Sequence, residues 1–320
     1  TGMFGKWGLG APGSSGDPVN QGWDEFFGYN CQRQAHTFYP KHLWHNDNKV
    51  MLDGKAYSHD LIQKQALKFI RDNAKKPFFA YLPITIPHAA MQCPEEDVAP
   101  FRKKFPQFED KIGKYSHGTK VRNPVAAFAG MMTRMDRGVG QVLDLLDELK
   151  IADNTLVLFT SDNGPHNEGG HQPGFFNSNG PLRGHKRDLY EGGIRVPLIA
   201  YWPGRGKAGS VSDHICAHWD LMPTFCELAK ISTPKHTDGI SYIPALTGGK
   251  QKKHDYLYWE FHSYGNAQAI RMGDWKAIRL NVKNDPDAPI QLYNLKQDIG
   301  ETKNIAATHP NVVKRIAPLF

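Results

Sequence analysis

The sequence lacks long hydrophobic runs and is poor in cysteine. No apolar stretch in its 320 residues approaches the roughly 20 that a membrane helix needs, so we expect no membrane span. The four cysteines include no Cys-x-x-Cys pair, which argues against a zinc ribbon or a disulfide scaffold. A bridge between Cys216 and Cys226 stays open. Internal repeats and low-complexity tracts are also absent, which excludes solenoid and linker-like classes.

Charge of one sign is not concentrated anywhere. The formal net charge is +7, and its only clusters lie at residues 102–104 and 250–253. Such short clusters are typical of solvated faces, so we expect no nucleic-acid partner. A diffuse basic balance does suit an anionic polymer substrate. Apolar residues make up 40% of the chain and charged residues 22%, which is ordinary for a globular enzyme.

Two oxygen-donor side chains follow an apolar run. Residues 156–160 read as a buried strand, and Asp162, Asn163 and Gly164 come directly after it. Ligands of open α/β sheets bind at the carboxyl ends of strands, and a carboxylate beside an amide oxygen suits a hard cation such as Ca²⁺ or Mg²⁺. An ordinary Asp-Asn-Gly turn that closes a strand is the alternative reading at this point.

A cationic, glycine-rich connection follows that turn. Arg183, Lys186 and Arg195 lie within it, ahead of the apolar strand predicted at 196–202. A divalent ion with nearby Lys and Arg is what a tetrahedral oxyanion ester needs for binding and for stabilisation of its charge. For any one of these cations, a solvated position on a surface loop is the alternative.

Strands and helices alternate through most of the chain. The patterns predict elements at 58–73 (a helix capped by Ser58), 78–82 (strand), 125–149 (helix), 156–160 and 196–202 (strands), and 221–229 (helix). This alternation indicates an α/β fold with a mixed sheet flanked by helices. The stripe with Met132 and Met135 on the long helix is expected to be core.

The pattern changes after the Gly248–Gly249 break. Short strands with turn signals are predicted at 256–261, 267–271, 275–280 and 290–295, followed by a terminal helix. A small antiparallel sheet is the natural arrangement for such strands. We therefore predict a catalytic domain over 1–249 and a small C-terminal α+β subdomain over 250–320.

Five short segments together resemble the formylglycine-dependent sulfatases, arylsulfatase-type enzymes of the alkaline-phosphatase-like superfamily. The segments are 1–10, Pro87-His88, 161–164, 183–197, and 274–276 followed by 292–295. They occur in the family's order and extend over nearly the whole chain, so their joint occurrence is specific. The resemblance implies an alkaline-phosphatase-like sheet and the activity of a sulfuric ester hydrolase.

The resemblance also implies roles for individual residues. His88 matches the histidine that contacts sulfate and helps to protonate the leaving oxygen, and Lys186 matches a lysine that binds a sulfate oxygen. Lys6 matches a lysine that grips both the sulfate and the formylglycine nucleophile. Asp162 and Asn163 match two ligands of a bound Ca²⁺, with Mg²⁺ as the alternative ion.

The motif that carries the nucleophile is not present in this sequence. The family oxidises the first residue of Cys-x-Pro-x-Arg or Ser-x-Pro-x-Arg to formylglycine, and none of the four cysteines stands in such a motif. We therefore expect a sulfatase without its N-terminal segment, inactive as this chain alone. Its parent would need a formylglycine-generating or an anaerobic maturase enzyme. The parent's signal would lie in the missing segment, so we expect a periplasmic or secreted protein. Gly8 also stands where many members have a histidine.

Substrate selection depends on the loops. The polar and aromatic segment 30–40 with His36, and the loop 168–171 with His171, could line a pocket for a sugar, and Arg183 could hold substrate. Ordinary loop packing is the alternative for each. The polar composition favours a sulfated carbohydrate over a small aryl sulfate. Two other functions stay open: a phosphomonoesterase or phosphodiesterase of the same superfamily, and a non-catalytic pseudoenzyme that binds sulfated glycans.

Overall fold

The structure, a computed structural model, describes residues 1–320, which form two compact units. Unit 1 comprises Thr1–Ala152 and His166–Gln172, and unit 2 comprises Asp153–Pro165 and Pro173–Phe320. The residues after 249 therefore share a unit with much of the chain before them. The separate subdomain at 250–320 stays a prediction.

Unit 1 is built on a five-stranded mixed sheet with the order β4-β3-β2-β1-β5. The strands are β1 (Gly2–Lys6), β2 (Glu25–Tyr29), β3 (His42–His45), β4 (Asn48–Met51) and β5 (Ala80–Tyr81). β1 runs parallel to β2 and β5, while the β2–β3 and β3–β4 pairs are antiparallel. The predicted strand at 78–82 is thus shortened to two residues, although the carbonyls of Phe79 and Pro83 still accept from the amides of Gly2 and Lys6.

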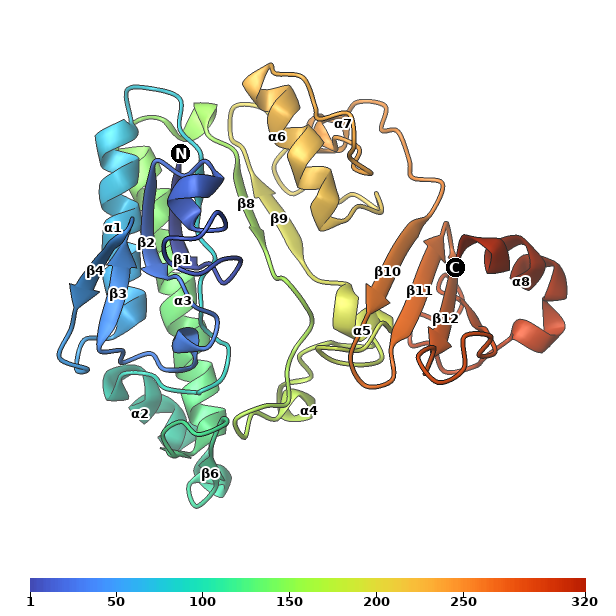
Figure 1. Cartoon of the computed structure of the whole chain (residues 1–320), viewed down its shortest axis with the longest axis horizontal. Helices are drawn as coiled ribbons and strands as arrows, with labels where there is room; N and C mark the ends of the chain where they lie inside the picture. The colour runs from blue at the N-terminus through green and yellow to red at the C-terminus, as the bar shows by residue number, and fades with distance from the viewer. The chain divides into compact units, whose positions relative to one another are not determined.

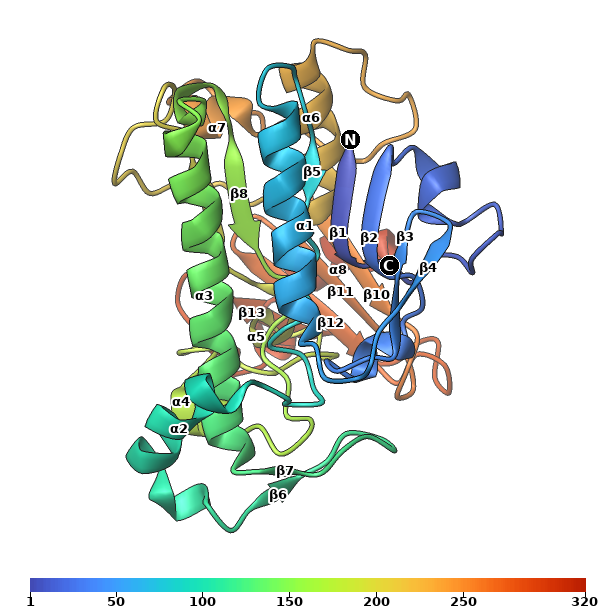
Figure 2. The ribbon, with the colours of Figure 1, turned by 90° about the vertical axis from the view of Figure 1, so that its left-hand side faces the viewer.

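Three helices complete unit 1: α1 (Ser58–Asn73), α2 (Glu95–Lys104) and α3 (Pro124–Glu148). α1 lies against β1 and β2, and α3 runs beside α1 (Figures 1 and 2). The contact between α1 and β1 includes the rings of Phe4 and Phe69, whose centroids are 5.3 Å apart. A two-stranded ribbon, β6 (Ile112–Gly113) and β7 (Val121–Arg122), lies between α2 and α3 in the chain.

Two details of these helices differ from the predictions. Ser58 is the first residue of α1 and not its cap; Tyr57 occupies the N-cap position and makes no side-chain capping hydrogen bond. On α3, Met132 is 37% exposed, whereas Met131 is fully buried. The burial of α3 is set by α1 and α2 packing on different parts of it, so one continuous stripe does not describe its core face.

Unit 2 contains the remaining regular structure (Figure 1). Its elements are β8 (Val157–Thr160), α4 (Pro173–Phe176), α5 (Glu191–Ile194), β9 (Leu198–Tyr201), α6 (Leu221–Ala229), α7 (Ile243–Thr247), β10 (Leu257–Phe261), β11 (Ala267–Met272), β12 (Trp275–Leu280), β13 (Gln291–Asn294) and α8 (Pro310–Ile316). β8 pairs only with β9, in antiparallel orientation. The strand expected at 156–160 is present, but the expectation that it is buried is wrong. β8 is half-buried, and its single partner strand, β9, is exposed.

Strands β10–β13 form the C-terminal sheet, which is antiparallel, as predicted. The structure gives its strand order as β10-β11-β12-β13. Alternate residues point to opposite faces. Ile270, Ala277 and Leu292 pack with Ile316 of α8 on one face. The other face, with Ala269, Ile278 and Tyr293, packs against Leu189 and Tyr190, which directly precede α5.

Short 3₁₀ helices occupy several connections. They lie at Pro18–Gln21, Gln34–His36, Pro106–Phe108, Ala152–Asn154, His218–Asp220, Ala306–Thr308 and Ala317–Leu319. All four cysteines are free thiols, so the bridge left open between Cys216 and Cys226 is not formed. None of the helices combines the length and the apolar character that crossing a membrane requires.

Candidate functional site

Lys6 and His88 lie at or beyond the carboxyl ends of two paired strands, at the same edge of the sheet of unit 1. Lys6 is the last residue of β1, and its amide donates to the carbonyl of Pro83 at 3.1 Å. His88 lies a few residues further along the segment that follows β5. β1 and β5 are parallel, so both segments continue from the carboxyl ends of their strands, where α/β sheets bind ligands.

Gly8 follows the same edge in a backbone conformation that excludes most side chains. Its φ is +82°, and a Cβ there would lie 2.7 Å from Oε1 of Gln32. A histidine would be strained at this position. This backbone geometry explains why glycine stands at this position, where many members of the family that the sequence resembles have histidine.

An aromatic cluster holds the His88 ring. His36 stacks on it almost in parallel, with centroids 5.7 Å apart, and Tyr115 meets both rings edge-on at 5.5 Å from His88 and 4.9 Å from His36. Nδ1 of His88 donates to the carbonyl of Ala89. That bond places a proton on Nδ1 and makes Nε2 the nitrogen at which His88 can exchange a proton.

His166 adds a third imidazole to this cluster, one that sequence reasoning missed. Its ring centroid is 6.0 Å from that of His88. Nε2 donates to the carbonyl of Pro87 at 3.0 Å, and Nδ1 accepts from the amide of Glu168 at 3.1 Å. Both bonds together require the neutral ring with its proton on Nε2. Only its place two residues after Gly164 could have signalled it.

His171 lies deeper in the same cluster. It is 3% exposed, stacks on Phe128 with centroids 3.7 Å apart, and lies 5.1 Å from the His166 ring. The structure therefore brings together His36, His88 and His171, which were singled out separately in the sequence. Given its burial, His171 is placed to support His166, and its role toward substrate stays a prediction.

In unit 2, the Asp162 turn (residues 162–164) presents two oxygen donors. Asp162 is exposed, and its carboxylate makes no hydrogen bond or ion pair with the chain. Nδ2 of Asn163 donates to the carbonyl of Gly164 at 2.9 Å, which leaves Oδ1 as its ligand atom. These donors suit a hard cation by type. No group of three or more His, Cys, Asp or Glu side chains in the structure could hold a metal ion.

The Asp162 turn and the Lys186 loop (residues 183–188) are joined by backbone contacts. The amide of Lys186 donates to the carbonyl of Pro165 at 2.8 Å, and the amide of Gly164 donates to that of Gly193 at 2.9 Å. A Cβ on Gly164 would lie 1.9 Å from the carbonyl oxygen of Gly192, so the approach requires glycine. The predicted metal ligands and Lys186 thus belong to one local assembly.

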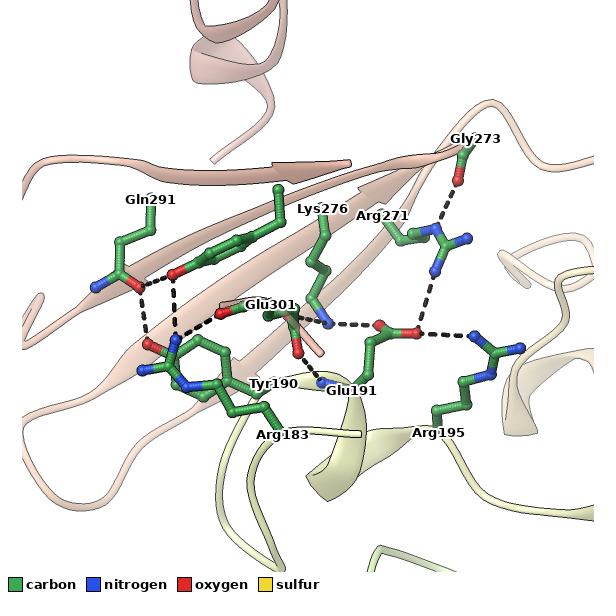
Figure 3. Close-up of polar contacts among 10 residues, drawn as sticks. Arg183, Tyr190, Glu191, Arg195, Arg271, Gly273, Lys276, Gln291 and Glu301 are labelled. Atoms are coloured by element: carbon green, nitrogen blue, oxygen red, sulfur yellow. Dashed lines mark hydrogen bonds and ion pairs between the residues drawn. The ribbon is translucent and has the colours of Figure 1, made fainter. Parts of the chain in front are cut away.

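Arg183 contacts Tyr190, the C-terminal sheet and the loop that follows this sheet (Figure 3). Its guanidinium lies 3.9 Å from the Tyr190 ring centroid, and Nη1 donates to the carbonyl of Glu301 at 2.8 Å and to Oη of Tyr293 at 3.4 Å. These contacts fix the start of the Lys186 loop. The role predicted for Arg183 in substrate binding stays a prediction, and the contacts show a structural role beside it.

Glu191 at the start of α5 is a buried carboxylate that sequence reasoning did not single out for a role. It accepts from Nζ of Lys276 at 2.8 Å and from Nη1 of Arg271 at 3.1 Å, with Arg195 at 3.7 Å (Figure 3). Burial acts to raise the pKa of Glu191, but the positive charges of Lys276 and Arg271 outweigh it and hold the pKa below its ordinary value.

Glu301 lies on the other side of the same lysine. It is fully buried, accepts the Glu191 amide proton at 2.7 Å, and is 3.9 Å from Nζ of Lys276. Burial, with the negative charge of Glu191 adding to it, raises the pKa of Glu301 to about 7 despite Lys276. One lysine is shared between two carboxylates, and Glu191, which holds it more closely, keeps its charge.

The Glu301→Gln variant should change how stability depends on pH. A carboxyl pKa raised from 4.5 to about 7 stabilises the fold fully below pH 4.5, and this contribution is lost as pH rises through 7. The shift corresponds to up to about 3 kcal/mol. Thermal unfolding at pH 5 and pH 8 checks it: the Tm of Glu301→Gln relative to the parent should be higher at pH 8. An equal difference at both pH values would contradict the assignment.

Comparison with known proteins gives the family. Residues 1–231 match the family model described as Sulfatase, which is more than half of the chain. The chain belongs to the sulfatase family. Residues 184–317 also match the model described as N-sulphoglucosamine sulphohydrolase, C-terminal, a range that contains the Lys186 loop, α5 and the C-terminal sheet. The alkaline-phosphatase-like fold predicted from the sequence is confirmed by solved sulfatase structures.

Several curated sulfatases are similar over most of this chain. The N-acetylgalactosamine-6-sulfatase of Canis lupus familiaris is 31% identical over 86% of the chain and 51% of its own length. The N-acetylgalactosamine-6-O-sulfatase of Bacteroides thetaiotaomicron is 28% identical over 88% of the chain and 54% of its own length. The chain thus spans about half the length of the curated relatives it matches.

Among solved structures, Ps i-CgsB in complex with k-i-k-neocarrahexaose superposes with a TM-score of 0.80 at 30% identity, over 98% of this chain and 68% of that one. A protein in complex with its substrate D-glucosamine-2-N,6-O-disulfate superposes with a TM-score of 0.77 at 19% identity, over 99% of this chain and 78% of that one, and supports the fold alone.

Proposed function

We propose that the chain belongs to a sulfuric ester hydrolase that removes sulfate from a sulfated carbohydrate. The observation that carries the proposal is the placement of Lys6 and His88 at one edge of a parallel strand pair, within a chain of the sulfatase family. The relatives named above are N-acetylgalactosamine-6-sulfatases by name, and a solved relative is in complex with k-i-k-neocarrahexaose by title. Both names favour a sugar substrate over a small aryl sulfate.

His88 is the residue we assign to protonation of the leaving oxygen. Its Nδ1 is committed to the Ala89 carbonyl, so a proton delivered to substrate comes from Nε2. The stack with His36 and the edge contact with Tyr115 hold the His88 ring in one orientation. Lys6 and Lys186 are assigned to the sulfate oxygens, where a fixed ammonium group stabilises the charge that develops during transfer.

The formylglycine and the divalent cation that the family implies would supply the nucleophile and neutralise charge on the sulfate oxygens. Asp162 and Asn163 are the residues we assign to the cation. The uncommitted carboxylate of Asp162 and the remaining Oδ1 of Asn163 fit Ca²⁺ by donor type, with Mg²⁺ as the alternative. We further propose an extracytoplasmic location and maturation by a formylglycine-forming enzyme, both supported by the family resemblance.

The 320-residue chain should bind Ca²⁺ weakly. Two oxygen ligands are far fewer than the roughly 6–8 that Ca²⁺ takes, so each ion would keep most of its water. Isothermal calorimetry should give a dissociation constant of about 10⁻³ M or weaker, in the range of the weakest natural sites. Asp162→Ala should abolish even this binding, and Asp213→Ala, an exposed aspartate of the same unit, should leave it unchanged. Submicromolar affinity would contradict the ligand assignment.

The proposed function is tested with a panel of substrates and with a form of the protein that contains the formylglycine nucleophile, here called the active protein. Sulfate release is measured from N-acetylgalactosamine 6-sulfate, a carrageenan oligosaccharide and 4-nitrophenyl sulfate, and phosphate release from 4-nitrophenyl phosphate. Turnover of a sulfated sugar that is lost in Lys186→Ala is the expected result. Preferred turnover of the phosphate ester would overturn the sulfatase assignment. Binding of the sulfated sugars without turnover would instead favour the pseudoenzyme.

A further inference from the structure

The C-terminal sheet presents a row of polar side chains to α5. Arg271 of β11 and Lys276 of β12 are directly paired across the strands, so both project from the face that packs on Leu189 and Tyr190. Tyr293 of β13 is the next partner of Lys276 in the register. Two cations side by side on a covered face repel each other unless an anion is supplied. Glu191 supplies it from α5 by accepting from both.

Glu301 ties the same face to two separate points of the chain. Its carboxylate accepts the amide proton of Glu191 at 2.7 Å, and its backbone carbonyl accepts from Arg183 at 2.8 Å. Arg183 and Glu191 stand at the two ends of the segment that contains Lys186. Figure 3 shows both ends reaching the same side of the sheet.

α5 in turn contacts both the Lys186 loop and the Asp162 turn. The amide of Gly192 donates to the carbonyl of Arg183 at 2.6 Å, and the carbonyl of Gly193 accepts from Gly164 at 2.9 Å. A Cβ on Gly193 would lie 2.1 Å from the carbonyl oxygen of Asp188, so α5 and the Lys186 loop are in direct backbone contact. A shift of α5 would therefore move both the Lys186 loop and the Asp162 turn.

We propose that the C-terminal sheet is the positioning element for this part of the site, acting through Arg183 and Glu191 on the Lys186 loop and the Asp162 turn. Arg183 and Glu191 are positioning residues, since their side chains act through Lys186 and not on substrate. The catalytic consequence rests on the sulfatase function proposed above. The structural consequence does not.

The choice of arginine at 183 fits this role. The planar guanidinium stacks on Tyr190 while Nη1 donates to a carbonyl, and a lysine cannot do both in the same geometry. Arg183→Lys keeps the charge and loses the stacked fork, whereas Arg183→Ala loses both. A residue that served only as a charge for sulfate would tolerate lysine much better.

Hydrogen–deuterium exchange of the 320-residue chain, without any sulfate ester, tests the structural part. In Arg183→Ala the amides of Lys186 and Asp188 should exchange about tenfold faster, because a stacked cation and a charge-assisted hydrogen bond are lost. Arg183→Lys should show most of the same increase. The matched control is Arg315→Ala, an exposed arginine on α8, which should leave these amides unchanged. Unchanged exchange in Arg183→Ala would overturn the proposal.

Steady-state kinetics of the active protein separate the proposal from the function on which it rests. Arg183→Ala should lower kcat by up to about 10²-fold with little change in KM, as expected for a displaced catalytic group. Combined with Lys186→Ala, it should add little further loss. A raised KM with unchanged kcat, rescued by Arg183→Lys, would mean that Arg183 binds substrate and would overturn the proposal. Faster exchange together with full activity of Lys186→Ala would instead retain the positioning and reject the proposed function.

Discussion

His88→Ala should lower kcat on a sulfated sugar by about 10²–10⁴-fold in the active protein, and by much less on 4-nitrophenyl sulfate. A sugar alkoxide is a poor leaving group that needs a proton, whereas nitrophenolate departs without one. The stacked, hydrogen-bonded ring places Nε2 of His88 as the atom that would deliver that proton. The measurement is kcat for both substrates with the parent and the variant.

Two further variants make the comparison specific. Lys186→Ala should reduce turnover of both substrates to a similar degree, since both share the sulfate group that the lysine is assigned to bind. His262→Ala, which removes a histidine whose side chain is 75% exposed, should change neither. Equal losses on both substrates in His88→Ala would mean that His88 binds sulfate and does not act as the acid.

Lys276→Met should destabilise unit 2 by about 3–5 kcal/mol, the usual cost of removing one partner from a buried ion pair. The lysine is fully buried, and its loss leaves Glu191 with Arg271 as its nearest cation while Glu301 loses its only cation within 4 Å. Denaturant unfolding of the 320-residue chain, followed by hydrogen exchange of β12 amides, gives the local free energy of unfolding.

The control for this variant is the same Lys→Met substitution made at an exposed lysine. Lys283→Met replaces an exposed lysine just after β12 and should stay within about 0.5 kcal/mol of the parent. Glu301→Gln combined with Lys276→Met should cost less than Lys276→Met alone, because the second change removes the carboxylate that is left without a cation within 4 Å. Equal destabilisation by Lys276→Met and Lys283→Met would show that the buried pair contributes little.

Much of the secondary structure could be predicted because it is encoded locally. The helices at Ser58–Asn73 and Leu221–Ala229 and the strand at Trp275–Leu280 have the predicted bounds, since apolar periodicity and flanking turn residues act within a few residues. The hairpin of β11 and β12 was equally predictable from Gly273-Asp274 between two apolar runs. The antiparallel sheet followed from short connections, which allow no crossover.

The predictions failed where the partner of an element mattered. The strand expected at 78–82 is reduced to Ala80–Tyr81, and the apolar run at 156–160 pairs only with β9 and is not buried. Which methionine of α3 is buried depends on how α1 and α2 pack on it. The periodicity of apolar residues shows which side of a segment can be buried, but it does not show which element packs against that side.

The candidate site divides in the same way. The short motifs around Lys6, His88, Asp162 and Lys186 were visible because each is contiguous and matches a family pattern. The ring contacts of His88 with His166 and Tyr115 were not visible, since the three residues come from distant parts of the chain.

The sequence by itself determined the family, the order of its motifs and the residue types that its chemistry needs. Only the tertiary structure decided how those residues are held. Glu191 and Lys276 are 85 residues apart and meet because the register of β11 and β12 sets Lys276 beside Arg271 on the face that α5 covers. A buried charge is stable only with its partner in place, and no local pattern specifies a partner so distant in the chain.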